Sequence, residues 1–143
     1  MFLTKANQNL SRIFGAKHVP ITPEEIELVY SRQLLGIINA KTTKGISLGY
    51  LTGILYLAPN DLSGVNLCPS ASTGCKASCL FTAGRGRFYK TTRQRMIKTL
   101  AYLSDKPRFV KGLHRSIKSL IVKARNKGLK PVVSLNGTSD ILF

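Results

Sequence analysis

The stretch that decides the fold is Gly53-Ile54-Leu55-Tyr56-Leu57-Ala58-Pro59, a short apolar run between a glycine and a proline. Its length and its breakers predict a buried β-strand that ends at Pro59. A second run of this kind, Pro131-Val132-Val133-Ser134-Leu135, follows near the end of the chain. Helical patterns fill part of the segment between them, so we expect the two strands to be parallel neighbours in one sheet.

Two helices are predicted between the strands. Thr91 or Thr92 is the expected cap of the first helix, and Ser104 or Asp105 is the expected cap of the second. Gly128 has the position of a residue that ends the second helix. Apolar residues recur every three or four positions in the second helix, at Phe109, Val110, Leu113, Ile117, Leu120, Ile121 and Ala124.

An N-terminal helix is predicted from Thr22-Pro23-Glu24-Glu25, which has the pattern of a capping box, to about Leu34. Residues 36–49 are rich in turn formers and predict a loop. The fold class is therefore α/β: a strand–cysteine loop–two helices–strand crossover, giving a partial parallel sheet or a fragment of a (β/α) barrel. Residues 1–143 should form one domain. So small a sheet indicates either C-terminal truncation or completion by a partner, as a homo-oligomer or larger assembly.

The charge of the chain is one-sided, with 22 Lys and Arg against 6 Asp and Glu, a net charge of +16. Residues 85–130 hold 15 of these cations and a single acid, Asp105. Such a surplus favours an anionic partner, either nucleic acid or a phosphorylated small molecule, over a merely solvated helical surface. The candidate phosphate-binding residues are Arg85, Arg87, Arg93, Arg95, Lys98, Arg115, Lys118, Lys123 and Arg125.

No apolar run approaches the roughly 20 residues that a membrane-spanning helix needs. The first fifteen residues mix charged and polar side chains with apolar ones and lack the core of a signal peptide. We therefore expect a cytoplasmic protein without a membrane partner. Three cysteines make a poor disulfide framework in a reducing compartment, which favours metal ligation or redox chemistry.

The cysteines Cys68, Cys75 and Cys79 have the spacing C-x6-C-x3-C in a loop of small residues. Three thiolates in one loop can hold a [4Fe–4S] cluster with one iron left open, the position that binds S-adenosylmethionine in radical enzymes. A zinc site would need a fourth ligand. Buried or redox-active thiols without a metal are the third interpretation.

A second polar loop, Asn136-Gly137-Thr138-Ser139-Asp140, follows the second strand. Sites in parallel sheets form at the carboxyl ends of strands, so this loop and the cysteine loop should meet at one edge. Asn136, Thr138, Ser139 and Asp140 are the candidate cofactor-binding residues, although Asx and Ser/Thr turns explain them equally well. The turn Gly84-Arg85-Gly86-Arg87 could wrap an anion.

Several of these features together resemble the phage gene product 88 family. They are Asn39-Ala40-Lys41, the strand ending at Pro59, Cys68-Pro69, Cys75, Cys79, the helix start at Arg93 and Arg95, and residues 136–140. The resemblance covers roughly residues 35–140 and implies a bacteriophage or prophage protein acting in the host cytoplasm. The cysteine loop and the Asp-bearing strand end also resemble a divergent radical-SAM barrel, but the cysteine order differs and the chain is too short for a full barrel.

These observations leave three hypotheses, and whether the protein is an enzyme stays open. The first is an iron–sulfur, radical-SAM-like protein acting on a nucleotide or on nucleic acid. The second is a non-enzymatic nucleic-acid binder whose cysteine trio is metal-free or holds a structural zinc. The third is a scaffold whose basic surface is only solvated.

Overall fold

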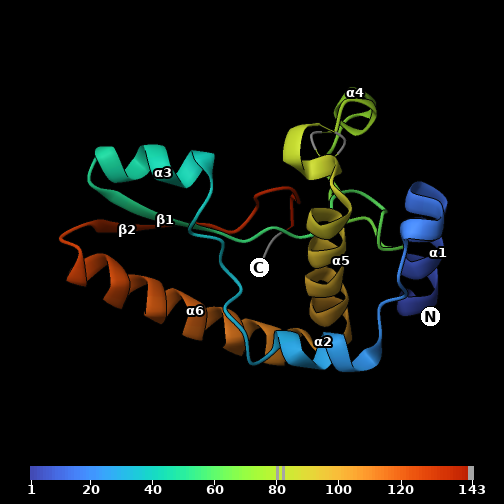
Figure 1. Cartoon of the computed structure of the whole chain (residues 1–143), viewed down its shortest axis with the longest axis horizontal. Helices are drawn as coiled ribbons and strands as arrows, with labels where there is room; N and C mark the ends of the chain where they lie inside the picture. The colour runs from blue at the N-terminus through green and yellow to red at the C-terminus, as the bar shows by residue number, and fades with distance from the viewer. Residues whose placement is uncertain (80, 82, 142–143) are drawn as a thin grey trace.

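The computed structural model of the chain describes residues 1–79, 81 and 83–141. Its small two-stranded sheet lies at one side of a helical assembly, with α5 near the centre and α1 at the far side (Figure 1). The mixed α/β fold class is confirmed. The elements are α1 (Phe2–Phe14), η1 (Gly15–Lys17), α2 (Pro23–Val29), α3 (Ala40–Ser47), β1 (Tyr50–Ile54), α4 (Thr73–Ala77), η3 (Gly84–Arg87), α5 (Tyr89–Ser104), α6 (Lys106–Asn126) and β2 (Lys130–Ser134).

The two strands are parallel, as predicted, with Tyr50 opposite Lys130 and Ile54 opposite Ser134. Helix α3 packs on β1, while α6 packs against both strands from the other side (Figure 1). The expected end of the first strand was wrong, because regular pairing stops at Ile54 rather than Pro59. Beyond it the chain enters the core, where the Ala58 N–H donates to Thr99 Oγ1 on α5 at 2.8 Å.

The outer edge of β2 is interrupted by a proline. The Lys130 N–H donates to the Gly49 carbonyl, and the Ser134 carbonyl accepts from Leu55, so these two residues face β1. Because the groups of alternate residues in a strand face opposite sides, Pro131 faces the open edge, where it supplies no N–H.

Helices α5 and α6 provide much of the core through Met96, Leu100, Phe109 and Leu120, which are fully or almost fully buried. The Asp105 cap of α6 is confirmed, since its carboxylate accepts from the Arg108 N–H at 3.0 Å.

The predicted threonine cap of α5 was wrong, because the helix begins at Tyr89 and the residue before it is Phe88. Thr92 is instead buried inside the helix, and its hydroxyl donates to the Gly86 carbonyl at 2.9 Å.

The N-terminal half departs most from the sequence predictions. The capping box of Thr22 and Glu25 is confirmed, but α2 ends at Val29, not near Leu34. Leu34 leaves the helix for the core, where its N–H donates to Ser116 Oγ at 3.0 Å.

Two helices of this N-terminal half were missed. Helix α1 buries Ala6 and Leu10. Helix α3 occupies the predicted loop because the Asn39 side chain accepts from the N–H groups of Lys41 and Thr42.

Candidate functional site

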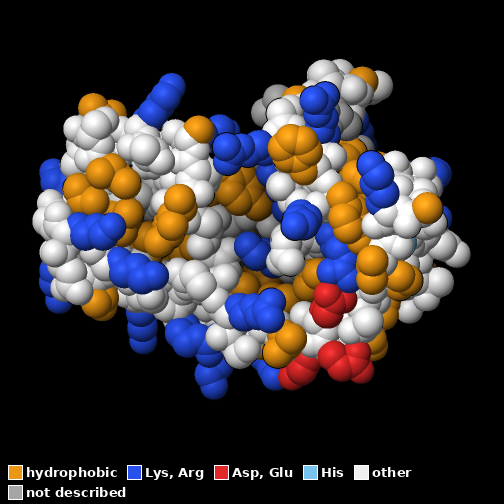
Figure 2. Space-filling view, viewed as in Figure 1, with side chains coloured by type: hydrophobic (Ala, Val, Ile, Leu, Met, Phe, Trp, Pro, Cys, Tyr) orange, Lys and Arg blue, Asp and Glu red, His pale blue; other side chains and the backbone are white. Residues whose placement is uncertain are grey.

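A groove of about 820 Å³ lies between the N-terminal turns of α3 and α5, beside the carboxyl ends of both strands. It is hollowed between basic side chains on the face shown in Figure 2. No carboxylate is among the described residues that line it. We call this feature the basic groove, after the five cations that line it: Lys41, Arg85, Lys90, Arg95 and Lys98.

Arg95 is one of the two partly buried cations in this groove. Its guanidinium lies over the ring of Tyr56, 5.0 Å from the ring centroid. Its Nε and Nη1 atoms are buried and have no hydrogen-bond partner within residues 1–79, 81 and 83–141. Burial lowers the pKa of Arg95, and the electrostatic influence of Tyr56 and Cys79 opposes that change. The side chain is therefore held in place by a ring, while part of its hydrogen-bonding capacity stays unused.

Lys98 lies one helical turn after Arg95 and is half-buried. Its Nζ donates to the Leu34 carbonyl at 2.9 Å. Burial lowers the pKa of Lys98, and the charge of Arg95 lowers it further. Two adjacent cations without a carboxylate are costly to desolvate, and a bound anion would offset that cost.

The walls of the groove come from short polar segments. On one side Asn39 caps α3, and its Nδ2 lies 3.5 Å from the Tyr56 hydroxyl. On the other side η3 contributes Gly84 and Arg85. Anion wrapping by this turn stays a prediction. The N-terminal turns of both α3 and α5 line the groove, so the partial positive charge of two helix ends adds to the cations.

The two strand-end loops meet, as predicted. The Asp140 N–H donates to the Leu67 carbonyl at 2.9 Å. The Cys68 thiol lies 3.9 Å from the Thr138 carbonyl, and the same sulfur accepts from the Asn60 N–H at 3.2 Å. Thr138 is also a lining residue of the basic groove, so the junction borders the groove there.

The other candidate cofactor residues serve mainly the turn itself. The Asn136 carboxamide bonds to the backbone of Ile141 and accepts from the Ser139 hydroxyl. Ser139 is buried, while the Asp140 side chain is exposed and does not line the groove. Only Thr138, of the four, is placed where it can contact a ligand in the basic groove.

The three cysteines do not share one site. Cys68 lies at the loop junction, Cys75 is exposed on α4, and Cys79 lies within electrostatic reach of Arg95. Across the described part of the chain, no three His, Cys, Asp or Glu side chains are grouped so that they could hold a metal ion. The thiols as placed do not fit a single metal ion. The iron–sulfur cluster, S-adenosylmethionine and zinc stay predictions.

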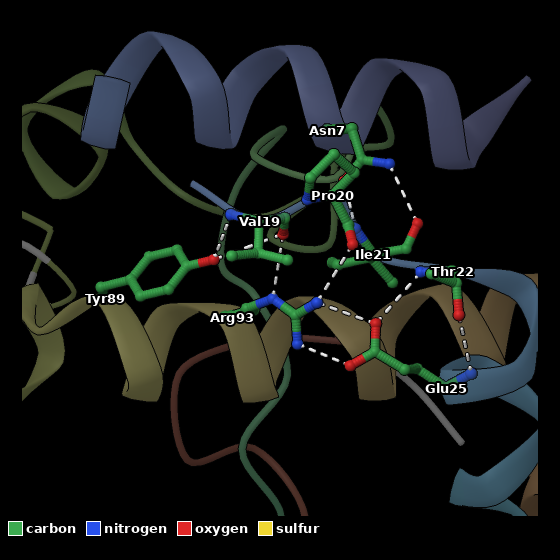
Figure 3. A network of polar contacts seen from close by, with 8 residues as sticks. All are labelled: Asn7, Val19, Pro20, Ile21, Thr22, Glu25, Tyr89 and Arg93. Carbon is green, nitrogen blue, oxygen red and sulfur yellow. Dashed lines mark hydrogen bonds and ion pairs between the residues drawn. The ribbon is translucent and has the colours of Figure 1, made fainter. Parts of the chain in front are cut away.

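Arg93, predicted to bind phosphate, is instead occupied within the fold (Figure 3). Its guanidinium forms an ion pair with Glu25 at 2.7 Å and donates to the carbonyls of Val19 and Pro20 at 3.2 Å each. The Tyr89 hydroxyl also bonds to Val19. Because Glu25 and two backbone carbonyls already bind the Arg93 guanidinium, we do not place Arg93 in the basic groove, and its phosphate binding stays a prediction. These contacts fasten the segment before α2 to α5.

The remaining predicted cations lie outside the groove. The guanidinium of Arg115 donates to the Tyr30 carbonyl. Lys118, Lys123 and Arg125 are exposed on α6, which carries no acidic residue, and Arg87 is exposed on η3. The acidic side chains visible in Figure 2 gather over α2, at the opposite end of this face from α3.

A second cavity, of about 680 Å³, lies between α2 and α6. It contains cations and carboxylates together, and Arg108 in it is paired with Glu27. The presence of carboxylates in its lining distinguishes it from the basic groove.

Among the groove residues that sequence reasoning missed are Lys41, Lys90, Tyr56 and Ile38. A signal for Lys41 was present, since Asn39 followed by Thr42 has the spacing of a helix cap. No sequence signal near Tyr56 indicates that it belongs to the site, because its role is to support the Arg95 guanidinium, and Arg95 is far away in the sequence.

No helix within the described residues combines the length and the apolar character that crossing a bilayer requires.

Neither the search of curated proteins nor the search of solved structures gave a match. The relation to radical-SAM barrels therefore stays a prediction. A family model described as gene product 88 matches residues 6–143, nearly the whole chain. The chain therefore belongs to the phage gene product 88 family.

Proposed function

We propose that this protein binds nucleic acid by holding its phosphate groups in the basic groove. The observation that carries the proposal is that five cations, and no carboxylate, are found among the described residues that line the groove. Phosphate is the anion that such a set of Lys and Arg side chains recognises best, with Arg95 supplying a planar guanidinium. Occupation would offset the desolvation of Arg95 and Lys98.

The exposed cations of α6 support the same function. Lys118, Lys123 and Arg125 face solvent on a helix without acids, so they extend the positive surface beyond the groove. Phosphate contacts fix the position of a nucleic acid but carry no direct sequence information. We therefore expect affinity with little sequence preference and with strong salt dependence.

The test is fluorescence anisotropy of a labelled oligonucleotide at several salt concentrations. We compare the wild-type chain with a triple variant of the exposed groove cations, Lys41→Gln, Arg85→Gln and Lys90→Gln. Each lost phosphate contact should flatten the dependence of log K on log salt by about 0.7 to 0.9.

The matched control carries Arg12→Gln, Lys17→Gln and Lys44→Gln, which remove the same charge from exposed positions that do not line the groove. The control should keep most of the wild-type affinity and slope. If both triple variants lose affinity equally, the protein attracts polyanions only through its net charge, and the groove is not the binding site.

A metal centre held by the cysteines is the second proposal. It is favoured by the position of two thiols, since Cys68 contacts Thr138 of the groove and Cys79 is electrostatically coupled to Arg95. Holding one metal would require the α4 segment to bring Cys75 toward them. Elemental analysis of anaerobically purified protein tests it, with a Cys68→Ser variant as comparison. Iron or zinc that is lost in this variant would support it, and metal-free wild-type protein would reject it.

A further inference from the structure

We infer that the basic groove accepts one unpaired nucleotide, with its phosphate at Arg95 and Lys98 and its base against Ile38. This inference rests on the proposed function and narrows it from nucleic acid in general to unpaired nucleotides. It depends on three features of the groove: its size, the depth of its cations, and an apolar side chain at its rim.

The size favours a small ligand. A groove of about 820 Å³ lies within the range of about 300 to 1,000 Å³ that is usual for small-molecule and cofactor sites. A double helix is a convex body with its phosphates on the outside and its bases stacked inside. It could meet the exposed cations Lys41, Arg85 and Lys90 at the rim, but it could not fill the groove.

The two partly buried cations favour a ligand whose phosphate group can enter the groove. Arg95 and Lys98 are both partly buried, and neither has a carboxylate among the described lining residues. Arg95 is kept in place by the Tyr56 ring, and Lys98 by the Leu34 carbonyl. Because these side chains are already ordered, less side-chain conformational entropy is lost when a phosphate binds, which favours binding.

Ile38 supplies the apolar contact. Its side chain is 91% exposed although it is among the residues that line the groove. A single exposed isoleucine is ordinary on a protein surface. Beside a set of cations, however, Ile38 offers an apolar surface against which the flat face of a base can pack. The cations, which contact phosphate, do not provide such a surface.

Tyr56 is not available for base stacking in the same way. Arg95 covers its ring, and Gly137 lies so close that an added Cβ would be 2.6 Å from a ring carbon. Tyr56 therefore supports Arg95, and the base is left to Ile38. Contact with an aliphatic side chain distinguishes bases poorly, so the preference should be for unpaired over paired nucleotides and not for one base.

The experiment measures the affinity of the full chain for a short single-stranded oligonucleotide and for a duplex of equal length at one salt concentration. The single strand should bind about tenfold more tightly, although its charge density is lower. The variant Ile38→Ser should weaken single-strand binding by about fivefold and leave duplex binding unchanged, because base contact is lost and phosphate contact is kept. The control Leu48→Ser removes a side chain that is 74% exposed outside the groove and should change neither.

Competition with adenosine monophosphate distinguishes the two sources of an unpaired nucleotide. Displacement of the oligonucleotide would assign the groove to free nucleotides as well, while no displacement would assign it to strands. Equal affinity for single strand and duplex, or an Ile38→Ser variant with unchanged single-strand binding, would overturn the inference and leave the proposed function standing. Absence of binding to either oligonucleotide would reject both.

Discussion

Arg93 and Arg95 lie two residues apart on α5 and have opposite surroundings. Arg93 is bound by Glu25 and by two backbone carbonyls, and its side chain is only 14% exposed (Figure 3). Arg95 lies on the Tyr56 ring in a groove without a lining carboxylate, and two of its nitrogens lack partners in the described chain. The guanidinium of Arg93 is thus bound by groups of the fold itself, whereas Arg95 keeps N–H groups that can bind a ligand.

The pKa directions agree with this difference. The hydrogen bonds with Glu25 raise the pKa of Arg93, whereas burial lowers the pKa of Arg95. The fold therefore stabilises the charge of the first residue and destabilises the charge of the second. A cation that the fold itself disfavours is a better candidate for ligand binding than one that the fold has already neutralised.

The largest expected effect comes from replacing Arg93, the arginine that is bound within the fold. Arg93→Gln should lower the free energy of unfolding by about 2 kcal/mol, because hydrogen bonds of a charged group are lost and Glu25 is left unpaired. For a domain of this size that corresponds to a fall in Tm of about 6 °C. Thermal unfolding followed by circular dichroism measures it. Oligonucleotide affinity below the new Tm should be unchanged, and a loss there would contradict the separation of the two arginines.

Arg95→Gln should show the reverse pattern. Oligonucleotide affinity should fall about tenfold, equivalent to about 1.4 kcal/mol, because one ordered phosphate contact is lost. The Tm should stay the same or rise, because a partly buried cation without a counter-charge is removed. Anisotropy titration and thermal unfolding on the same preparation give both values. A marked fall in Tm with unchanged affinity would show that Arg95 serves the fold.

Tyr56→Leu sharpens the comparison by removing the support of Arg95 without removing its charge. The cation–π contact at 5.0 Å should be worth about 1 kcal/mol, so affinity should fall about threefold to fivefold. The double variant with Arg95→Gln should be no weaker than Arg95→Gln alone, since the two residues act through one contact. Additive losses in this cycle would mean that Tyr56 contacts the ligand directly.

The smallest effect is a pH dependence specific to the Arg93 contact. Hydrogen bonding to Arg93 holds the pKa of Glu25 below 4.5, so this carboxylate contributes stability above pH 4.5. That contribution is lost as the pH falls through the lowered pKa, because the unfolded chain binds the proton more tightly. The Tm of the wild-type protein should therefore fall more steeply below pH 4.5 than the Tm of Arg93→Gln. Equal slopes would show that Glu25 is not stabilised by Arg93.

The sequence predicted the crossover well because its signals are local. Apolar runs between breakers marked both strands, the three-to-four spacing marked α6, and Asp105 capped it as expected. Short helices were harder to predict from the sequence. Helix α3 depends on one capping asparagine, and its residues otherwise have the composition of a turn.

The candidate site could be predicted only in outline. The meeting of the two loops followed from the parallel topology, and three of the candidate cations, Arg85, Arg95 and Lys98, line the basic groove. Sequence alone could not separate Arg93 from Arg95, because the difference is made by Glu25 and Tyr56, both distant along the chain. Nor could the spacing of the cysteines show that Cys75 lies exposed on α4 while Cys68 lies at the loop junction.

Pro131 has a consequence for how copies of the chain can associate. An unprotected strand at the margin of a sheet invites neighbouring molecules to add their own strands and to grow into fibrils. Here the row of donors along that margin is broken at its second residue, so successive copies cannot register on it continuously. Pro131 thus makes the open edge of β2 a poorer template for a further strand.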